Sequence, residues 1–459
     1  MQIHDSFLVY TPTTEAPLSR PQALDRASWS TEMQAWLALH DPAQASFTPV
    51  PAPAEAPLPS SASVIANRSG QVLGAGRVLK SDQYPGLHRM NLNTGPHPQP
   101  RLTGAPNYRE VNGENIHGVA QPTIEGIKGV LTQAGAGPDG SGKPAVWTSL
   151  REEPVVYVNG RPFNVRELAG WTRNIENPGA TTEEVERSDA QLKADIQAEL
   201  ARNGNRILVH DESPDGKLVS HFEEVKPENV KTPREVFDGL KAEGYKVDYA
   251  RIPITDEKAP DMADFTALVN RLKDVPSDQP VIFNCHAGRG RTTTAMVMAG
   301  LMQRAAKDVP GDEGIAKEPA VREDIKERAN YRTGDYRVIL SLIRTLERGP
   351  KSKQEADVII DQYSGLQNLR ESILDYKQKA ETAPDVQQRV EARERGQQYL
   401  ERYFKLIAFD AYAKEQAPTG YQKTFETWMK EHPALPRLLD NVQLAMGFNE
   451  KSNGTSAYA

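Results

Sequence analysis

The segment that decides the fold runs from Val281 to Met302 and reads VIFNCHAGRGRTTTAMVMAGLM. It begins with a short apolar run, Val281–Phe283, that is typical of a buried strand. It ends with a longer apolar stretch, from about Thr292 to Met302, that favours a helix. The polar loop between them contains Gly288 and Gly290. This order predicts a strand-to-helix turn at the carboxyl edge of a parallel sheet, where α/β proteins bind ligands.

The loop places a thiol, five residues and an arginine in order, from Cys285 to Arg291. Backbone N–H groups in such a turn converge on an anion, and the positive end of the helix dipole adds to the attraction. Arg291 supplies a planar fork for phosphate oxygens, and the same field stabilises the thiolate of Cys285 as a nucleophile. The hydroxyl of Thr292 is expected to hydrogen-bond the sulfur. Sulfur-transfer and arsenate-reducing proteins use related loops, so the loop predicts thiolate chemistry on an oxyanion.

A phosphatase also needs an acid for the leaving oxygen and a base for the attacking water. The stretch RIPITDEKAP, from Arg251 to Pro260, follows a strand predicted at Val247–Ile252. Asp256 is therefore expected on a loop at the same sheet edge as Cys285. The alternative is that Asp256 caps a helix or forms a turn. Because it accompanies the catalytic loop, we predict it as the general acid.

Strands and helices alternate through the middle of the chain. Thr123 and Thr232-Pro233 are typical helix starts, and Asn159-Gly160 is the preferred two-residue hairpin turn. The alternation predicts an α/β fold with a mostly parallel central sheet flanked by helices. We expect a Pro/Ala/Ser-rich disordered leader at residues 1–75, a catalytic domain at 76–349 and a helical carboxy-terminal extension packed on it at 350–459.

Two further strand ends are expected at the edge that carries Cys285. Leu150 leads into Arg151, and Val209 leads into His210. Arg151 either faces the ligand or forms a structural salt bridge. His210 either steers protons or caps a turn. Both are predicted near the site with their roles open.

Composition limits the classes of function. The net charge of −7 over 459 residues argues against a nucleic-acid coat, and a polyanionic ligand must then meet local positive charge. Cys285 is the single cysteine, which excludes an intramolecular disulfide and a multi-thiolate zinc site. The expected chemistry needs no metal or organic cofactor. The oligomeric state is not predicted.

The amino-terminal part carries little signal for export or membrane insertion. No apolar run approaches the ~18 residues that cross a membrane, and no basic start precedes an apolar stretch as in a signal peptide. Six prolines lie between Pro42 and Pro59, which favours disorder. We expect a soluble protein that is either cytoplasmic or exported into a host cell by a non-cleaved leader.

Several segments together make the chain resemble a known family. They are Pro106–Arg109, Gly118–Thr123, Leu150–Pro154, Asn159–Phe163, Thr255-Asp256, Cys285–Thr292 and Tyr399–Tyr403. Spread over roughly residues 103–430, they resemble the protein-tyrosine-phosphatase-like inositol polyphosphatases, which comprise bacterial cysteine phytases and, more distantly, animal paladin. The leader also resembles that of bacterial effectors injected into host cells. The resemblance implies a protein-tyrosine-phosphatase-like fold.

The resemblance also implies roles for single residues. Cys285 becomes the nucleophile, Arg291 the phosphate clamp and Asp256 the general acid. Arg109 is placed in contact with the substrate, and His210 near the site. Basic residues after the loop helix bind peripheral phosphates in the family, and the candidates here are Lys326, Arg328 and Arg332. Further substrate contacts are implied for His286, Ala287, Gly288, Arg289, Gly290 and Thr292.

Two loop residues favour a highly phosphorylated substrate. Tyrosine-specific loops tend to carry small neutral residues at the positions of His286 and Arg289. A second arginine finds little charge on a monophosphorylated peptide, whereas each extra contact with a phosphate-crowded ring contributes roughly 1–3 kcal/mol. The alternative for Arg289 is a solvated or salt-bridged side chain. The sequence predicts hydrolysis of inositol polyphosphates such as phytate through a phosphocysteine.

Two rival functions stay open. A phosphoinositide or phosphotyrosine phosphatase would use the same loop, although no concentrated basic stretch indicates a lipid-facing surface. A catalytically silent phosphate-binding scaffold would need neither a thiol nor an acid. The joint presence of Cys285, Arg291 and Asp256 therefore favours an enzyme.

Overall fold

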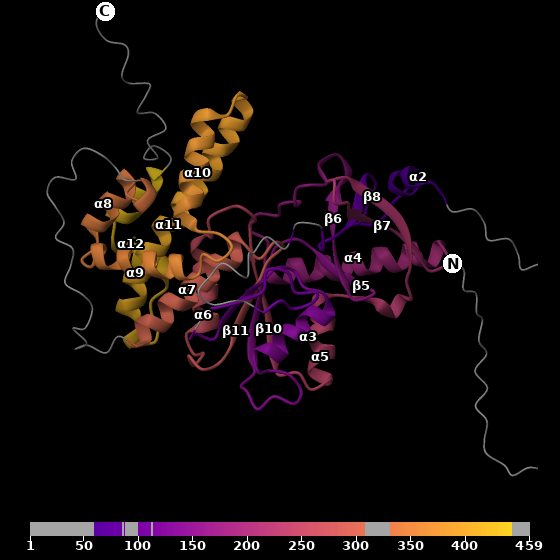
Figure 1. Cartoon of the computed structure of the whole chain (residues 1–459), viewed down its shortest axis with the longest axis horizontal. Helices are drawn as coiled ribbons and strands as arrows, with labels where there is room; N and C mark the ends of the chain where they lie inside the picture. Colours follow the sequence, from indigo (N-terminus) through magenta and orange to yellow (C-terminus); the bar gives the residue numbers. More distant parts are fainter. Residues whose placement is uncertain (1–58, 85–86, 88–99, 112, 308–330, 443–459) are drawn as a thin grey trace, which may run out of the picture. The chain divides into compact units, whose positions relative to one another are not determined.

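The computed structural model describes residues 59–84, 87, 100–111, 113–307 and 331–442. A five-stranded sheet in the order β10-β4-β11-β3-β2 carries the loop that begins at Cys285 (Figure 1). Its strands are β2 (Arg109–Glu110), β3 (Ile116–Val119), β4 (Ala145–Arg151), β10 (Val247–Ile254) and β11 (Val281–Asn284). Strands β3, β4, β10 and β11 run parallel, and β2 is an antiparallel edge strand. The predicted mostly parallel central sheet is confirmed.

Helices cover both faces of this sheet: α3 (Ile124–Gln133), α5 (Pro233–Ala242), α6 (Met262–Leu272) and α7 (Gly290–Lys307). Successive side chains of a strand point to opposite faces. Accordingly, Val281 and Phe283 of β11 pack in one core cluster with α6 and α7, whereas Ile282 packs in another with α3 and α5. Thr123 and Thr232 cap α3 and α5, as predicted.

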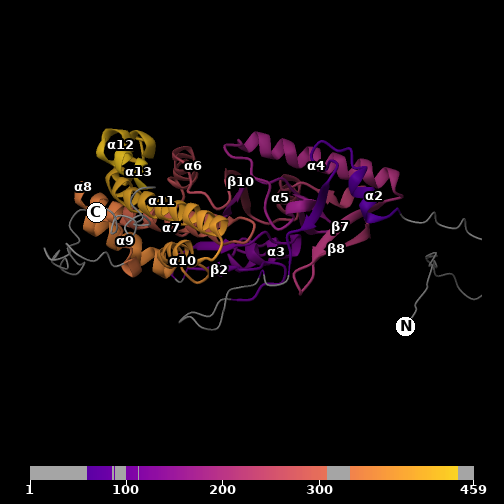
Figure 2. The same cartoon turned by 90° about the horizontal axis from the view of Figure 1, so that it is seen from above.

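A second, six-stranded sheet in the order β8-β7-β1-β6-β5-β9 was not predicted. Its strands are β1 (Arg77–Ser81), β5 (Val155–Val158), β6 (Arg161–Glu167), β7 (Arg206–Glu212), β8 (Leu218–Glu224) and β9 (Val230–Lys231). Helix α4 (Thr182–Arg202) packs along this sheet (Figure 2) through Leu192, Ile196 and Leu200. The predicted hairpin turn joins β5 to β6, with positive φ at Asn159 and Gly160.

The prediction that the strand around Ile207–Val209 joins the central sheet is wrong. This strand, β7, pairs with β1 and β8 in the six-stranded sheet. The chain turns back at Ser213, whose carbonyl accepts a hydrogen bond from Gly216, where φ is +76°. The turn leads into antiparallel β8 instead of a crossover helix. His210 consequently lies in a different sheet from the strand that precedes Cys285.

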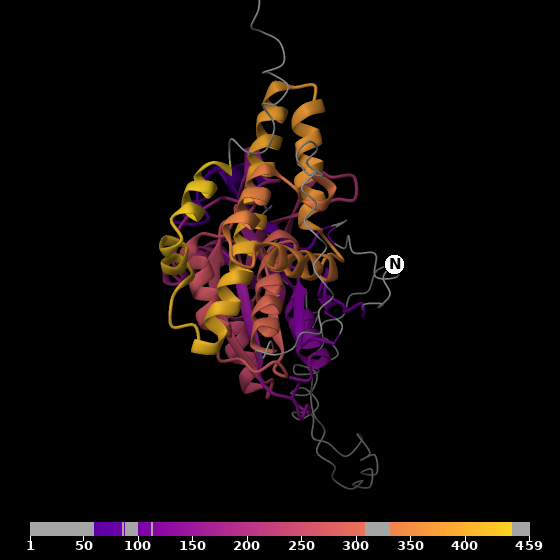
Figure 3. The same ribbon diagram turned by 90° about the vertical axis from the view of Figure 1, so that its left-hand side faces the viewer.

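The carboxy-terminal part is helical, with α8 (Arg337–Thr345), α9 (Gly349–Gln362), α10 (Leu369–Thr382), α11 (Val386–Gln416), α12 (Phe425–Glu431) and α13 (Ala434–Asp440). Helices α10 and α11 lie side by side, and α11 also packs on α7 (Figure 3). Tyr403, Phe409 and Trp428 belong to the same core cluster as Phe283 and Cys285. The extension therefore completes the core behind the catalytic loop.

The end of the predicted leader belongs to the folded part of the chain. Residues 1–58 lie outside the described residues, but α2 (Ser61–Ala66) is formed. Arg68 is buried in an ion pair with Glu199 of α4, and Leu73 is buried as well. The boundary predicted at residue 75 is thus too late. None of the described helices is long and apolar enough to cross a membrane.

Candidate active site

The loop after Cys285 is held through its carbonyl groups. The carbonyl of His286 accepts a hydrogen bond from the Gln121 N–H (2.9 Å), and that of Ala287 accepts one from Asn107 Nδ2 (2.9 Å). Among the described residues, none of the loop's N–H groups from position 286 to 290 finds an acceptor. These donors have no acceptor in the described part of the chain, and their binding of an anion stays a prediction.

The two glycines of the loop lie in tight contacts of different kinds. Gly288 has a φ of +67°, and a Cβ there would lie 2.5 Å from Ala120 N and 2.7 Å from the carbonyl carbon of Val119. At Gly290 a Cβ would lie 3.1 Å from Nη1 of Arg402 on α11. The loop is therefore pressed against the end of β3 on one side and against α11 on the other.

The guanidinium of Arg291 is buried and oriented by Glu153. Its Nη1 and Nη2 donate to the two carboxylate oxygens of Glu153 at 3.2 and 3.1 Å, and Nη1 also donates to the Ile254 carbonyl. Burial opposes the charge, but Asp256 and Glu153 raise the pKa of Arg291 well above its ordinary value. Arg291 Nε is buried without a partner among the described residues, which leaves it available to a phosphate oxygen.

The ion pair continues behind the loop as a chain of alternating charges. Arg151 Nε donates to Glu153 at 2.6 Å, and its Nη1 donates to Asp82 at 2.9 Å. Asp82 in turn lies 3.3 Å from Nε2 of His286, so the series of contacts returns to the loop that leads into Arg291. We call Arg291, Glu153, Arg151 and Asp82 the buried ion-pair chain. Within it Arg151 forms the structural salt bridge that the sequence left open.

Burial and neighbouring charges shift the pKa values of the carboxylates in the buried ion-pair chain in opposite directions. Burial alone would raise the pKa of Glu153, but Arg291 and Arg151 hold that pKa well below its ordinary value. For Asp82, Arg151 and then His286 outweigh burial in the same way. Burial lowers the pKa of His286 despite the opposing charge of Asp82, which favours a neutral imidazole near pH 7. The Nε2 side of the His286 ring thus faces Asp82, and the His286 backbone N–H remains available to a ligand.

Asp256 meets Arg291 from the loop after β10. Its Oδ1 lies 3.2 Å from Arg291 Nη2, and its Oδ2 accepts a hydrogen bond from Asn174 Nδ2 at 2.6 Å. Buried Glu152 accepts hydrogen bonds from the Asp256 N–H and the Thr255 hydroxyl. The Asp256 side chain remains 31% exposed, so a substrate can reach it. The loop that carries Asp256 therefore lies beside Arg291, at the edge of the sheet where the sequence predicted both residues.

Two buried arginines flank the catalytic loop. Arg109 on β2 donates to Thr293 Oγ1 at 2.8 Å, and burial lowers its pKa to about 10 although nearby Cys285 acts in the opposite direction. Arg402 on α11 donates to the Lys258 carbonyl at 2.6 Å and forms no ion pair with a described carboxylate. Burial lowers the pKa of Arg402 as well. Arg109 lies beside the loop, and its contact with a substrate stays a prediction, whereas Arg402 was not among the predicted site residues.

Other residues that the sequence predicted for the site are not found in contact with the loop's ligand-facing groups in the described part of the chain. His210 is buried in the six-stranded sheet, where burial lowers its pKa to about 4, and no described contact joins it to the loop. Arg332 is exposed in a short turn, and Lys326 and Arg328 lie outside the described residues. The Thr292 hydroxyl is buried without a hydrogen-bond partner among the described residues, so its predicted bond to sulfur is not formed here. In the same part of the chain no cluster of metal-ligating side chains occurs.

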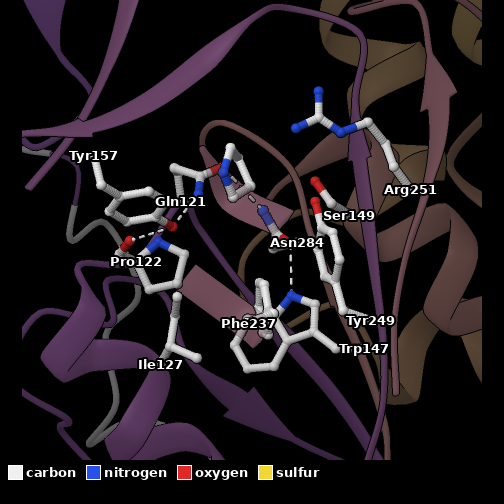
Figure 4. Close-up of a pocket in the computed structure, with 11 residues that line it drawn as sticks. Gln121, Pro122, Ile127, Trp147, Ser149, Tyr157, Phe237, Tyr249, Arg251 and Asn284 are labelled. Carbon is white, nitrogen blue, oxygen red and sulfur yellow. Dashed lines mark hydrogen bonds between the residues drawn. The ribbon is translucent and has the colours of Figure 1, made fainter. Parts of the chain in front are cut away.

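A chain of buried hydrogen bonds supports the residue before Cys285 (Figure 4). Trp147 Nε1 donates to Asn284 Oδ1 at 2.8 Å, and Asn284 Nδ2 donates to Gln121 Oε1 at 3.1 Å. Gln121 Nε2 donates to the hydroxyl of Tyr157 at 2.8 Å. These side chains line a small cavity and link β4, β11 and β5. They fix the end of β11 from which the catalytic loop starts.

The segment that carries both loops matches a known family. Residues 148–303 match the model of the PTP-like phytase family, and the description of that family names inositol hexakisphosphate. The match contains the end of β4, the loop of Asp256 and the loop of Cys285. The resemblance predicted from the sequence is confirmed, because this part of the chain matches the model of the PTP-like phytases.

Over a longer stretch the chain is similar to paladin. It is 31% identical to paladin of Gallus gallus over 356 residues, which cover 75% of this chain and 38% of that protein. It is 29% identical to the effector protein hopD2 of Pseudomonas syringae over 185 residues, 40% of this chain and 36% of the effector. A solved PTP-like myo-inositol phosphatase from Mitsuokella multacida, in complex with myo-inositol-(1,3,4,5)-tetrakisphosphate, matches with a TM-score of 0.48 and 18% identity, over 78% of this chain and 48% of that one.

The buried ion-pair chain predicts a large loss of stability when one charge is removed. Glu153→Gln keeps the shape of the side chain but removes the negative charge that balances Arg291 and Arg151. Breaking a buried ion pair in this way lowers the free energy of unfolding by about 3–5 kcal/mol. Urea unfolding monitored by tryptophan fluorescence measures the change. The matched control is Glu167→Gln, which removes a partner of Arg77 from a largely exposed pair and should cost about 1 kcal/mol or less. Equal losses for the two variants would contradict the prediction.

Proposed function

We propose that this chain is a cysteine-dependent phosphatase that hydrolyses inositol polyphosphates such as phytate. The observation that carries the proposal is the convergence of Asp256 and Arg291, 3.2 Å apart, beside the loop that begins at Cys285. A phosphate-binding scaffold needs no acid at this position. The match of residues 148–303 to the PTP-like phytases supports the same activity.

In the first proposed step the loop binds a phosphoryl group and Cys285 attacks it. The free N–H groups and Arg291 neutralise charge on the non-bridging oxygens. A sulfur–phosphorus bond forms while the bond from phosphorus to the ring oxygen breaks. Asp256 gives its proton to that leaving oxygen, so the inositol product leaves with a neutral hydroxyl group at that ring position.

In the second proposed step water hydrolyses the phosphocysteine. Asp256, now a carboxylate, accepts a proton from the water as its oxygen attacks phosphorus. The sulfur–phosphorus bond breaks, which releases inorganic phosphate and restores the thiolate of Cys285. Neither step uses a metal or an organic cofactor. The same side chain serves as acid and then as base, because proton donation in the first step leaves the carboxylate that the second step uses.

More arginine side chains surround the loop than a single phosphate group would contact. Arg109 and Arg402 flank the loop, and Arg289 within it is half-buried with no ion pair to a described carboxylate. The Nε of Arg289 is buried without a partner in the described part of the chain. These three side chains favour a substrate with several phosphates over a phosphotyrosine peptide. Delivery into a host cell stays a prediction, which the similarity to an effector favours.

Cys285→Ser is expected to abolish turnover of phytate while leaving binding largely intact, because the N–H groups and Arg291 remain. Phosphate release measures turnover, and isothermal titration calorimetry measures binding. A serine variant that retains more than a small fraction of the wild-type activity would rule out the phosphocysteine mechanism.

Asp256→Asn is expected to lower kcat/KM for phytate by the ~10²–10⁴-fold typical of a lost general acid. The loss should be smaller for p-nitrophenyl phosphate, because its leaving group needs little protonation. Steady-state kinetics with both substrates provide the test, since kcat/KM reports only steps through the first bond cleavage. Equal losses on the two substrates would remove Asp256 from this role.

Arg289→Ala is expected to harm phytate hydrolysis far more than hydrolysis of p-nitrophenyl phosphate, which reaches only the loop. The effect should appear mainly in KM and weaken at high salt, because salt screens the added charge. Kinetics at low and high ionic strength measure it, and Arg344→Ala on the exposed surface of α8 serves as a charge-matched control. An equal loss on both substrates would mean that Arg289 serves the structure of the loop.

A further inference from the structure

Helix α11 binds the stretch that follows Asp256. Four consecutive residues, from Glu257 to Pro260, each contact a different side chain of this one helix. The Arg395 guanidinium pairs with the Glu257 carboxylate, and the Ala259 N–H donates to Gln398 Oε1 at 2.9 Å. Arg402 Nη2 donates to the Lys258 carbonyl at 2.6 Å. Lys405 Nζ donates to the Pro260 carbonyl at 2.7 Å. We call these four side chains of α11 the loop clamp.

The members of the loop clamp share one face of α11. Arg395, Gln398, Arg402 and Lys405 recur at spacings of three and four residues, which bring side chains onto the same side of a helix. Arg402 and Lys405 are buried, and Gln398 is half-buried. Three of the four contacts engage the loop's backbone, so they fix its path and not only its side chains.

The backbone conformation of the loop needs such support. Glu257, directly after Asp256, has a φ of +59°, in the left-handed region that is unfavourable for a residue with a Cβ. Such strain persists where the surroundings determine the conformation. Glu152 accepts a hydrogen bond from the Asp256 N–H, and the loop clamp contacts the four residues that follow Asp256. The position of the Asp256 carboxylate is therefore set from both sides.

We propose that the loop clamp positions Asp256 for proton transfer, so that the carboxy-terminal helices act in catalysis through α11. Gln398 and Lys405 are the positioning residues of this device, and they act through Ala259 and Pro260. The inference rests on the proposed function, in which Asp256 is the general acid. Proton transfer demands hydrogen-bond reach between acid and leaving oxygen, and a shift of the loop lengthens that distance.

The test compares the double variant Gln398→Ala/Lys405→Met with the wild type on two small substrates. A displacement of ~1 Å can cost about 10²-fold in rate, so kcat/KM for phenyl phosphate should fall by about that factor. For p-nitrophenyl phosphate, whose leaving group barely needs the acid, the loss should be several-fold smaller. Gln398→Glu, which keeps the acceptor oxygen for the Ala259 N–H, should restore most of the loss seen in Gln398→Ala.

Lys414 provides a matched control on the same helix. Its side chain is as buried as that of Lys405, but it pairs with Glu355 of α9 at 3.1 Å and does not reach the loop of Asp256. Lys414→Met should therefore leave the ratio of kcat/KM for the two substrates unchanged. Equal losses on both substrates in the double variant, or a changed ratio in Lys414→Met, would overturn the proposal.

Amide hydrogen exchange provides a readout that does not depend on activity. Exchange in a peptide covering Glu257–Ala259 should accelerate in Gln398→Ala/Lys405→Met and stay at the wild-type rate in Lys414→Met. Unchanged exchange in the double variant would overturn the clamp. A wild type that hydrolyses aryl phosphates but not phytate contradicts the proposed substrate and leaves this test intact. A wild type without phosphatase activity overturns the proposed function and with it the role in proton transfer.

Discussion

In the buried pair between Arg291 and Glu153, two guanidinium nitrogens donate to two carboxylate oxygens, and the geometry of the whole site follows from this contact. In the proposed function Arg291 binds phosphate, which requires its guanidinium to keep one orientation, and the pair with Glu153 fixes that orientation. Burying two charges is unfavourable unless further partners compensate them. Arg151 and Asp82 supply that compensation, so the orientation of one side chain requires four charges in order.

This requirement explains why the site draws on parts of the chain that are far apart. Glu153 follows β4 and Arg291 lies in α7, both at the five-stranded sheet. Asp82 comes from the end of β1 in the six-stranded sheet, so that sheet supplies a charge that the catalytic sheet lacks. Helix α11 adds contacts to the loop of Asp256. The two sheets and the carboxy-terminal helices thus form one electrostatic unit around a single loop.

Local sequence patterns predicted those parts of the fold that depend on local interactions. The caps at Thr123 and Thr232, the Asn159-Gly160 hairpin and the strand-loop-helix order at Cys285 are set by a few neighbouring residues. The placement of β7 was wrong because periodicity identifies a strand but not the sheet that it joins. Asp82 and Arg402 were missed because each gains its importance from contacts with residues distant in sequence. The spacing of these residues from Cys285 carries no signal. Although Arg402 lies in the family-like segment Tyr399–Tyr403, its contact with the loop of Asp256 emerges only in the folded structure.

The solitary thiol has a practical consequence. Cys285 is the single cysteine in the chain, and it is only 3% exposed at the base of a loop whose surroundings attract anions. A thiol reagent that reacts with the native protein therefore reports on one sulfur atom in one environment. Negatively charged alkylating agents should be favoured over neutral ones of the same size, because Arg291 and the loop's N–H groups attract them. Under the proposed function, the stoichiometry of such labelling would count the molecules that carry an intact Cys285 in a folded loop, without any substrate.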